Sequence, residues 1–81
     1  FEGCTGLTTA PEIPNSVTSM YWTFSRCTNL TGEITINANL NSSEGWYGCF
    51  SDTTKPIQLT GTCPILSKLA ETSSNGNVTV K

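Results

Sequence analysis

Short apolar–polar–apolar triplets return along the chain at a nearly constant spacing. The central triplet is Ile34-Thr35-Ile36. Pro11-Glu12-Ile13 precedes it at an offset of 23, Ile57-Gln58-Leu59 follows it at the same offset, and Val78-Thr79-Val80 comes next at an offset of 21. Alternation with a period of two is typical of a half-buried strand. The pattern therefore predicts four short strands, near 10–13, within 28–37, within 55–61 and at 78–80.

A longer motif repeats with the same spacing. Phe1-Glu-Gly-Cys4-Thr-Gly-Leu7-Thr returns as Phe24-Ser-Arg-Cys27-Thr-Asn-Leu30-Thr, again at an offset of 23. Self-similarity at a fixed period of this length indicates a solenoid, in which each coil buries its apolar edge against the next. We expect an α/β repeat fold with about one short strand per ~23-residue coil. Residues 1–61 would form the coils and residues 62–81 a capping helix and strand, all in one domain.

Helical spacing is expected in two of the connections. Val17, Met20, Tyr21 and Phe24 follow an i, i+3, i+4, i+7 pattern, which predicts a turn or two of helix within 17–27. Trp22 falls off that stripe and is expected to be partly exposed. Residues 41–45 are polar and show no helical stripe.

The clearest helix is predicted after residue 61. Thr62 is the expected N-cap and Pro64 lies near the first helical position, where its missing N–H costs nothing. Ile65, Leu66, Leu69 and Ala70 form the apolar stripe. Gly76 is expected to take a positive φ in the turn that leads to the last strand.

The register is irregular between residues 38 and 56. Phe50-Ser-Asp-Thr53-Thr echoes the segment that begins at Phe24, whereas Trp46-Tyr-Gly-Cys49 echoes the segment that begins at Phe1. The two alignments are mutually exclusive. We expect a three-residue insertion before Phe50 and a compensating deletion after Thr54, which would bring Ile57 back to the regular spacing.

Composition narrows the classes of function. The 81 residues carry four basic and six acidic side chains, a net charge of −2, and Ser, Thr and Asn make up 30 of them. Nucleic acid and anionic membranes both require a basic surface, so neither is an expected partner. No apolar run is long enough to span a membrane, so membrane insertion by this chain is not expected.

The chain opens at Phe1 in the middle of a motif, and we interpret it as the C-terminal part of a longer repeat protein.

The four cysteines are interpreted through the repeat. Cys4 and Cys27 occupy equivalent positions, so we expect them to stack as buried free thiols. A bridge between Cys49 and Cys63 stays open as an alternative. No histidine and no Cys-x-x-Cys pair is present, which argues against a zinc site, and no cofactor or metal is predicted.

The Phe-x-x-Cys-Thr-x-Leu-Thr motif, followed by a strand and repeated at a fixed spacing, resembles the bacterial surface-antigen (BspA-type) class of leucine-rich repeats. The resemblance covers residues 1–37, and residues 38–81 are similar to the irregular end of such an array. Pro11 within a strand and Thr53 in place of a cysteine depart from the usual pattern. The resemblance implies a parallel sheet, packing against further repeats of the same chain, a cell-surface or secreted location, and adhesion or protein binding.

The outward residues of the strands are the candidate binding site. If Ile13, Ile36, Leu59 and Val80 face inward, the central outward row is Glu12, Thr35, Gln58 and Thr79. The flanking rows contribute Glu33 on one side and Asn37 and Thr60 on the other. We expect this face to bind a protein or a host-surface ligand.

Two other functions are kept as alternatives. The fragment would be a structural cap or spacer of a surface or phage-fibre protein, or its aromatic residues Trp22, Trp46 and Tyr47 would stack on a sugar. Enzymatic activity is not expected. General acid–base catalysis would fall to carboxylates, and Glu12 and Glu33 lie in adjacent rows rather than as a facing pair.

Overall fold

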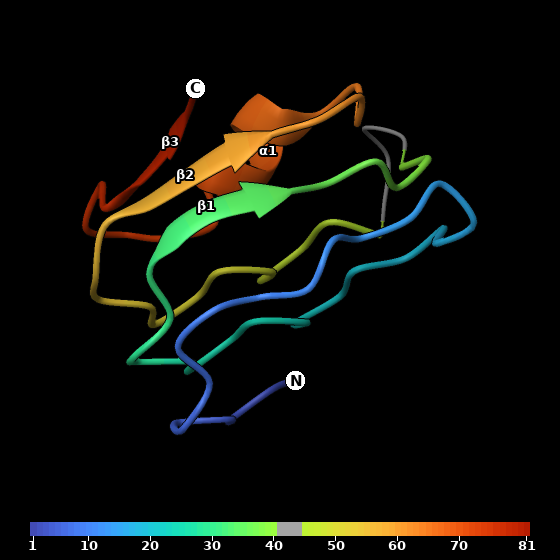
Figure 1. Cartoon of the computed structure of the whole chain (residues 1–81). Coiled ribbons are helices and arrows are strands. Elements are labelled where there is room, and N and C mark those ends of the chain that lie inside the picture. Colours follow the sequence, from blue (N-terminus) through green and yellow to red (C-terminus); the bar gives the residue numbers. More distant parts are fainter. Residues whose placement is uncertain (41–44) are drawn as a thin grey trace.

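The computed structural model describes residues 1–40 and 45–81 and has an α/β architecture. In these residues the elements are β1 (Gly32–Thr35), β2 (Ile57–Thr60), α1 (Leu66–Ala70) and β3 (Val78–Val80). The strands form a parallel sheet in the order β1-β2-β3, with α1 on one side of it (Figure 1). The polar segment 41–44, for which no helix was expected, lies outside the described residues.

The first predicted strand is reduced to a single bridge. Ile13 pairs in parallel with Ile36, as the repeat spacing predicts, and the Ile13 N–H donates to the Thr35 carbonyl at 2.9 Å. Pro11 and Pro14 flank this bridge, and neither has an N–H to extend the ladder. The prediction of a fourth strand at 10–13 is therefore wrong, although its alignment with β1 is right.

The pairing of β1 with β2 differs from the prediction by two positions. Ile34 lies opposite Leu59, not Ile57, so the offset between these strands is 25. The three-residue insertion predicted before Phe50 is present. The Phe24 ring stacks on the Phe50 ring with centroids 5.4 Å apart, and the offset between these residues is 26 in place of 23. The expected deletion after Thr54 shortens the offset by only one position, from 26 at the Phe pair to 25 at the β1–β2 pairing. A slip of two positions keeps every side chain on its own face, whereas a slip of one would invert them all.

The pairing of β2 with β3 has the predicted spacing, with Gln58 opposite Thr79. Val80 was expected to face the core, yet it is 45% exposed. β3 is the edge strand of the described sheet, so its outer flank has no described strand to cover it.

The segment 17–27 forms tight turns in place of the expected helix. Trp22 and Arg26 have φ of 56° and 62°, in the left-handed region, which interrupts any right-handed helix. The N–H groups of Thr23, Ser25 and Cys27 each donate to the carbonyl three positions earlier. Met20 and Phe24 are buried as predicted, but Tyr21 points out and is exposed.

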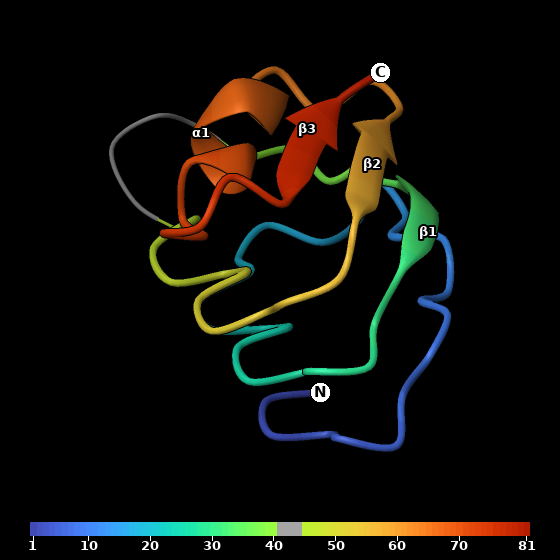
Figure 2. The same ribbon diagram turned by 90° about the vertical axis from the view of Figure 1, so that its left-hand side faces the viewer.

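Successive segments lie in order from the N-terminus at the bottom of Figure 2 to β3 at the top. On the side away from the strands, alternate N–H groups of one segment donate to carbonyls of the next at 2.6–3.1 Å: Met20 to Gly45, Trp22 to Tyr47, Phe24 to Cys49 and Arg26 to Ser51. These bonds join adjacent turns as the sheet joins adjacent strands. The buried core lies between the two sides.

Helix α1 confirms the C-terminal stripe but not its cap. Within α1, the side chain of Leu69 is fully buried in the core. The N-cap residue is Ile65, with no side-chain hydrogen bond, and the Thr62 N–H donates instead to Asn37 Oδ1 at 3.0 Å. Gly76 takes the expected positive φ, 73°.

All four cysteines are free thiols. Cys27, Cys49 and Cys63 are buried, while Cys4 is exposed, contrary to prediction. Cys4 belongs to the N-terminal segment, where Phe1 is also 53% exposed. Burial raises the pKa of the Cys27 and Cys49 thiols, because the thiolate loses its hydration in the core.

Candidate binding surfaces

The outward face of the sheet carries a continuous polar row. Glu33 lies opposite Gln58, which lies opposite Thr79, and all three side chains are exposed. The next residues along β1 and β2, Ile34 and Leu59, are buried. The alternation that the triplets predict is therefore present in β1 and β2.

Because the register of β1 with β2 differs from the prediction, the central outward row contains different residues from those predicted. Glu33, expected in a flanking row, takes the place beside Gln58 and Thr79. Thr35 lies opposite Thr60, and both are half-buried. Glu12, Thr35, Gln58 and Thr79 therefore do not form one row.

A groove of about 590 Å³ lies along the Glu33 row. Its lining includes the three row residues together with Thr31, Gly32, Pro56, Ile57, Gly76 and Asn77. We call this surface the strand-face groove. Among these lining residues Glu33 alone carries a charged side chain, and its Oε2 lies 2.9 Å from Lys81 Nζ. Both groups are well exposed, so the pair contributes little to stability and its partners are accessible to a ligand.

Glu12 and Asn37 lie in a separate hollow. A volume of about 380 Å³ is lined by Glu12, Pro14, Asn15, Asn37 and Thr62. Asn37 Nδ2 donates to Glu12 Oε2 at 3.3 Å, and Asn37 Oδ1 accepts from the N–H and hydroxyl of Thr62 at 3.0 and 3.3 Å. Asn37 thus joins the chain before β1 to the chain after β2, a structural role that its place in the sequence did not indicate.

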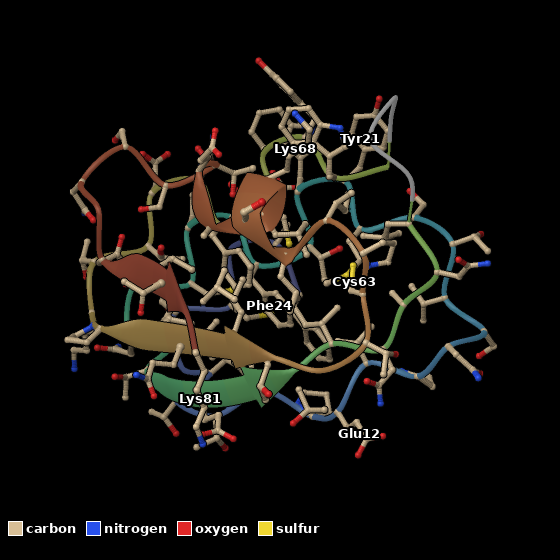
Figure 3. The ribbon with its side chains drawn as sticks, turned by 90° about the horizontal axis from the view of Figure 1, so that it is seen from above. Glu12, Tyr21, Phe24, Cys63, Lys68 and Lys81 are labelled. Carbon is tan, nitrogen blue, oxygen red and sulfur yellow. The ribbon has the colours of Figure 1, made fainter. Side chains whose placement is uncertain are left out.

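The tryptophan and tyrosine residues gather on the side of the molecule opposite Glu12 and Lys81. In Figure 3, Tyr21 and Lys68 lie on one side and Glu12 and Lys81 on the other, with Phe24 and Cys63 between them. The Trp22 and Tyr47 rings meet edge to face, with centroids 5.3 Å apart and an interplanar angle of 87°. Trp46 meets Tyr47 at 6.1 Å, and Lys68 Nζ lies 5.5 Å from the Trp46 ring centroid.

A hollow of about 240 Å³ is formed beside these rings. It is lined by Trp22, Trp46, Tyr47, Gly48, Ser51, Glu71 and Thr72, and we call it the aromatic hollow. The sequence identified its three aromatic residues. It did not indicate Glu71 or Lys68, because their proximity depends on how α1 and the residues after it pack against the turn at 46–51.

Among residues 1–40 and 45–81, no three His, Cys, Asp or Glu side chains gather as metal ligands would. Glu33 lines the strand-face groove and Glu12 the separate hollow, so these two carboxylates do not share a site.

No helix in the described part of the chain has the length and apolar character needed to cross a membrane.

Comparison with known proteins finds no protein family, no curated protein and no solved structure that matches the chain.

Proposed function

We propose that this chain is a non-enzymatic binding module, part of a leucine-rich-repeat solenoid of the BspA type, at a bacterial cell surface or secreted from it. Its ligand is a protein segment, held for adhesion or protein–protein interaction on the outward face of the sheet. The observation that carries the proposal is the strand-face groove along the exposed row Glu33, Gln58 and Thr79.

An open polar face on a parallel sheet is unusual in itself. Parallel sheets are generally covered on both faces by helices, and their strands are then apolar throughout. Here the strands alternate, and α1 lies on the inner side, where Leu69 is buried. The outer side offers a carboxylate, an amide and a hydroxyl group in neighbouring strands. Because adjacent strands are about 4.8 Å apart, this row presents hydrogen-bonding groups at regular intervals to an extended peptide.

Two features support the solenoid. The Phe1, Phe24 and Phe50 rings form a stacked column, with successive centroids 5.7 and 5.4 Å apart. The residue two positions after each Phe has a left-handed φ: Gly3 at 74°, Arg26 at 62° and Asp52 at 62°. The position two residues after each Phe thus repeats its left-handed conformation from segment to segment, as equivalent positions do in the coils of a repeat protein.

The proposal is tested by peptide selection. A phage-displayed library of random peptides is selected on the immobilised chain, and the enriched peptides are titrated against a Glu33→Ala, Gln58→Ala, Thr79→Ala triple variant. We expect the triple variant to bind them at least tenfold more weakly, because the removed groups are the polar contacts of the groove. All three side chains are exposed, so the variant is expected to keep its fold, which circular dichroism checks.

A matched control carries three exposed polar substitutions away from the groove: Glu2→Ala, Thr18→Ala and Ser19→Ala. It is expected to bind the peptides as the wild type does. Peptides that bind the groove variant and the wild type equally would refute the site. Failure to enrich any peptide would favour the structural cap or spacer.

A further inference from the structure

We propose that the aromatic hollow is a second binding site, independent of the strand-face groove, that takes a neutral carbohydrate ring. The site combines two exposed aromatic rings with a carboxylate and a hydroxyl group from separate segments of the chain. Trp22 and Tyr47 are 38% and 56% exposed. Ser51 and Glu71 complete the polar part of the lining. Thr72 also lines the hollow, but its hydroxyl already donates to the Leu69 carbonyl at 2.6 Å and accepts from the Phe50 N–H at 2.8 Å.

The Trp22 ring is held in place by its backbone and by Gly48. Trp22 has φ of 56°, a left-handed conformation that is unfavourable for a residue with a side chain. Trp22 N–H donates to the Tyr47 carbonyl at 3.1 Å, which fixes it to the next segment. A Cβ on Gly48 would overlap the six-membered ring of the Trp22 indole, so the ring lies directly against the glycine backbone.

This arrangement orients an exposed ring before any ligand arrives. A costly backbone conformation persists only when its surroundings impose it, and such residues concentrate at functional sites. Gly48, one segment later, adopts the same left-handed conformation with φ of 67° and without the steric cost of a side chain. The chain thus places one of its two tryptophan side chains where glycine would be easiest to accommodate. A pre-oriented ring loses little entropy on binding.

The chemistry of the lining matches a sugar. One face of a sugar ring is largely C–H and stacks on an aromatic surface, while the hydroxyl groups at its rim need acceptors and donors. Glu71 supplies a carboxylate acceptor, and Ser51 supplies a hydroxyl that both donates and accepts. The volume of about 240 Å³ lies slightly below the range for drug-sized ligands, which suits a single ring.

Other ligand classes fit less well. A ligand bearing phosphate would meet the Glu71 carboxylate in a chain whose net charge is already −2. A cationic ligand would compete with Lys68, whose ammonium already lies over the Trp46 ring. These charges favour a neutral ligand.

The test is a glycan array probed with the fluorescently labelled 81-residue chain, followed by titration of the retained sugar monitored by tryptophan fluorescence. We expect neutral saccharides to be retained. Trp22→Ala and Tyr47→Ala are expected to weaken binding at least tenfold, since each removes a stacking surface. Tyr21→Ala is the matched control, because Tyr21 is an exposed neighbouring aromatic residue outside the hollow lining, and it should bind as the wild type does.

Two further variants separate this site from folding and from the strand-face groove. Glu71→Gln keeps the size of an exposed side chain and is expected to weaken sugar binding at least fivefold, even if Trp22→Ala does not fold. The strand-face triple variant should keep full sugar affinity, so either proposal can fail alone. Retention of no sugar, retention of anionic glycans only, or unchanged affinity in Glu71→Gln would overturn the inference.

Discussion

At the scale of single residues, Gly61 carries the tightest backbone requirement of the turn after β2. Its φ is 118°, and a Cβ at this position would overlap the Ile36 carbonyl group and approach Asn37 Oδ1. The chain passes this close because the Cys63 N–H and the Thr62 N–H donate to these two oxygens at 3.1 and 3.0 Å. The close approach that makes glycine necessary at position 61 joins distant segments of the chain, so it is visible only in three dimensions.

Gly61→Ala is therefore expected to lower the free energy of unfolding by about 2–4 kcal/mol, since a strained φ and a backbone overlap act together. Gly32→Ala, at φ of 94° with open space around it, should show the strain alone, about 1 kcal/mol. Gly6→Ala has neither feature and should change the free energy by less than about 0.5 kcal/mol. Urea unfolding followed by circular dichroism measures all three, and equal losses would contradict this account.

At the scale of elements, the turns opposite the sheet are organised by the phenylalanine column. Phe24 is completely buried between Phe1 and Phe50 and stacks on both. Its N–H donates to the Cys49 carbonyl at 2.8 Å, so ring and backbone are fixed together. The column shows which of the two competing sequence echoes is the structural one: Phe50, not Trp46, follows Phe24.

Phe24→Ala is expected to cost about 3–5 kcal/mol, because it leaves a cavity between two rings as well as losing buried apolar surface. Phe1→Ala is the matched control at the exposed end of the column and should cost about 1 kcal/mol or less. A domain of this size has a total stability of only several kcal/mol, so Phe24→Ala should leave much of the chain unfolded at 25 °C. Equal urea midpoints for the two variants would exclude the column as a source of stability.

At the scale of the whole molecule, the buried thiols couple stability to pH. Burial raises the pKa of Cys49 and of Cys27 above the ordinary value of 9.0, because the folded state disfavours the thiolate. Below pH 9.0 both the folded and the unfolded chain keep these protons, so the stabilisation is fully present. Above pH 9.0 the unfolded chain loses protons that the folded chain retains, and stability falls as the pH rises.

The free energy of unfolding is accordingly expected to decrease between pH 9 and pH 10.5, with Cys49 contributing at most about 1.4 kcal/mol per pH unit. Cys49→Ala should reduce this slope, whatever its effect on stability at pH 7. Urea unfolding under reducing conditions at several pH values measures the slopes, and an identical slope in wild type and Cys49→Ala would refute the coupling.

The sequence by itself determined the features that depend on local pattern. Period-two alternation identified β1, β2 and β3 and the outward position of Gln58 and Thr79, because a strand projects its residues alternately whatever its neighbours are. Helical spacing located α1, and Gly76 marked the turn before β3. Even the error of two positions in the β1–β2 pairing left the outward face correct, since two is the period of a strand.

Only the tertiary structure decided the features that depend on contacts between distant segments. It set Glu33, not Glu12, beside Gln58, because the length of the connection determines the register. It replaced the expected helix at 17–27 with turns, because hydrogen bonds to residues 45–51 hold Trp22 and Arg26 at positive φ. It also brought Glu71 to Trp22 and Tyr47, although these residues come from separate segments of the chain. Periodicity reports which face a residue occupies; which other residues share that face depends on how the segments stack.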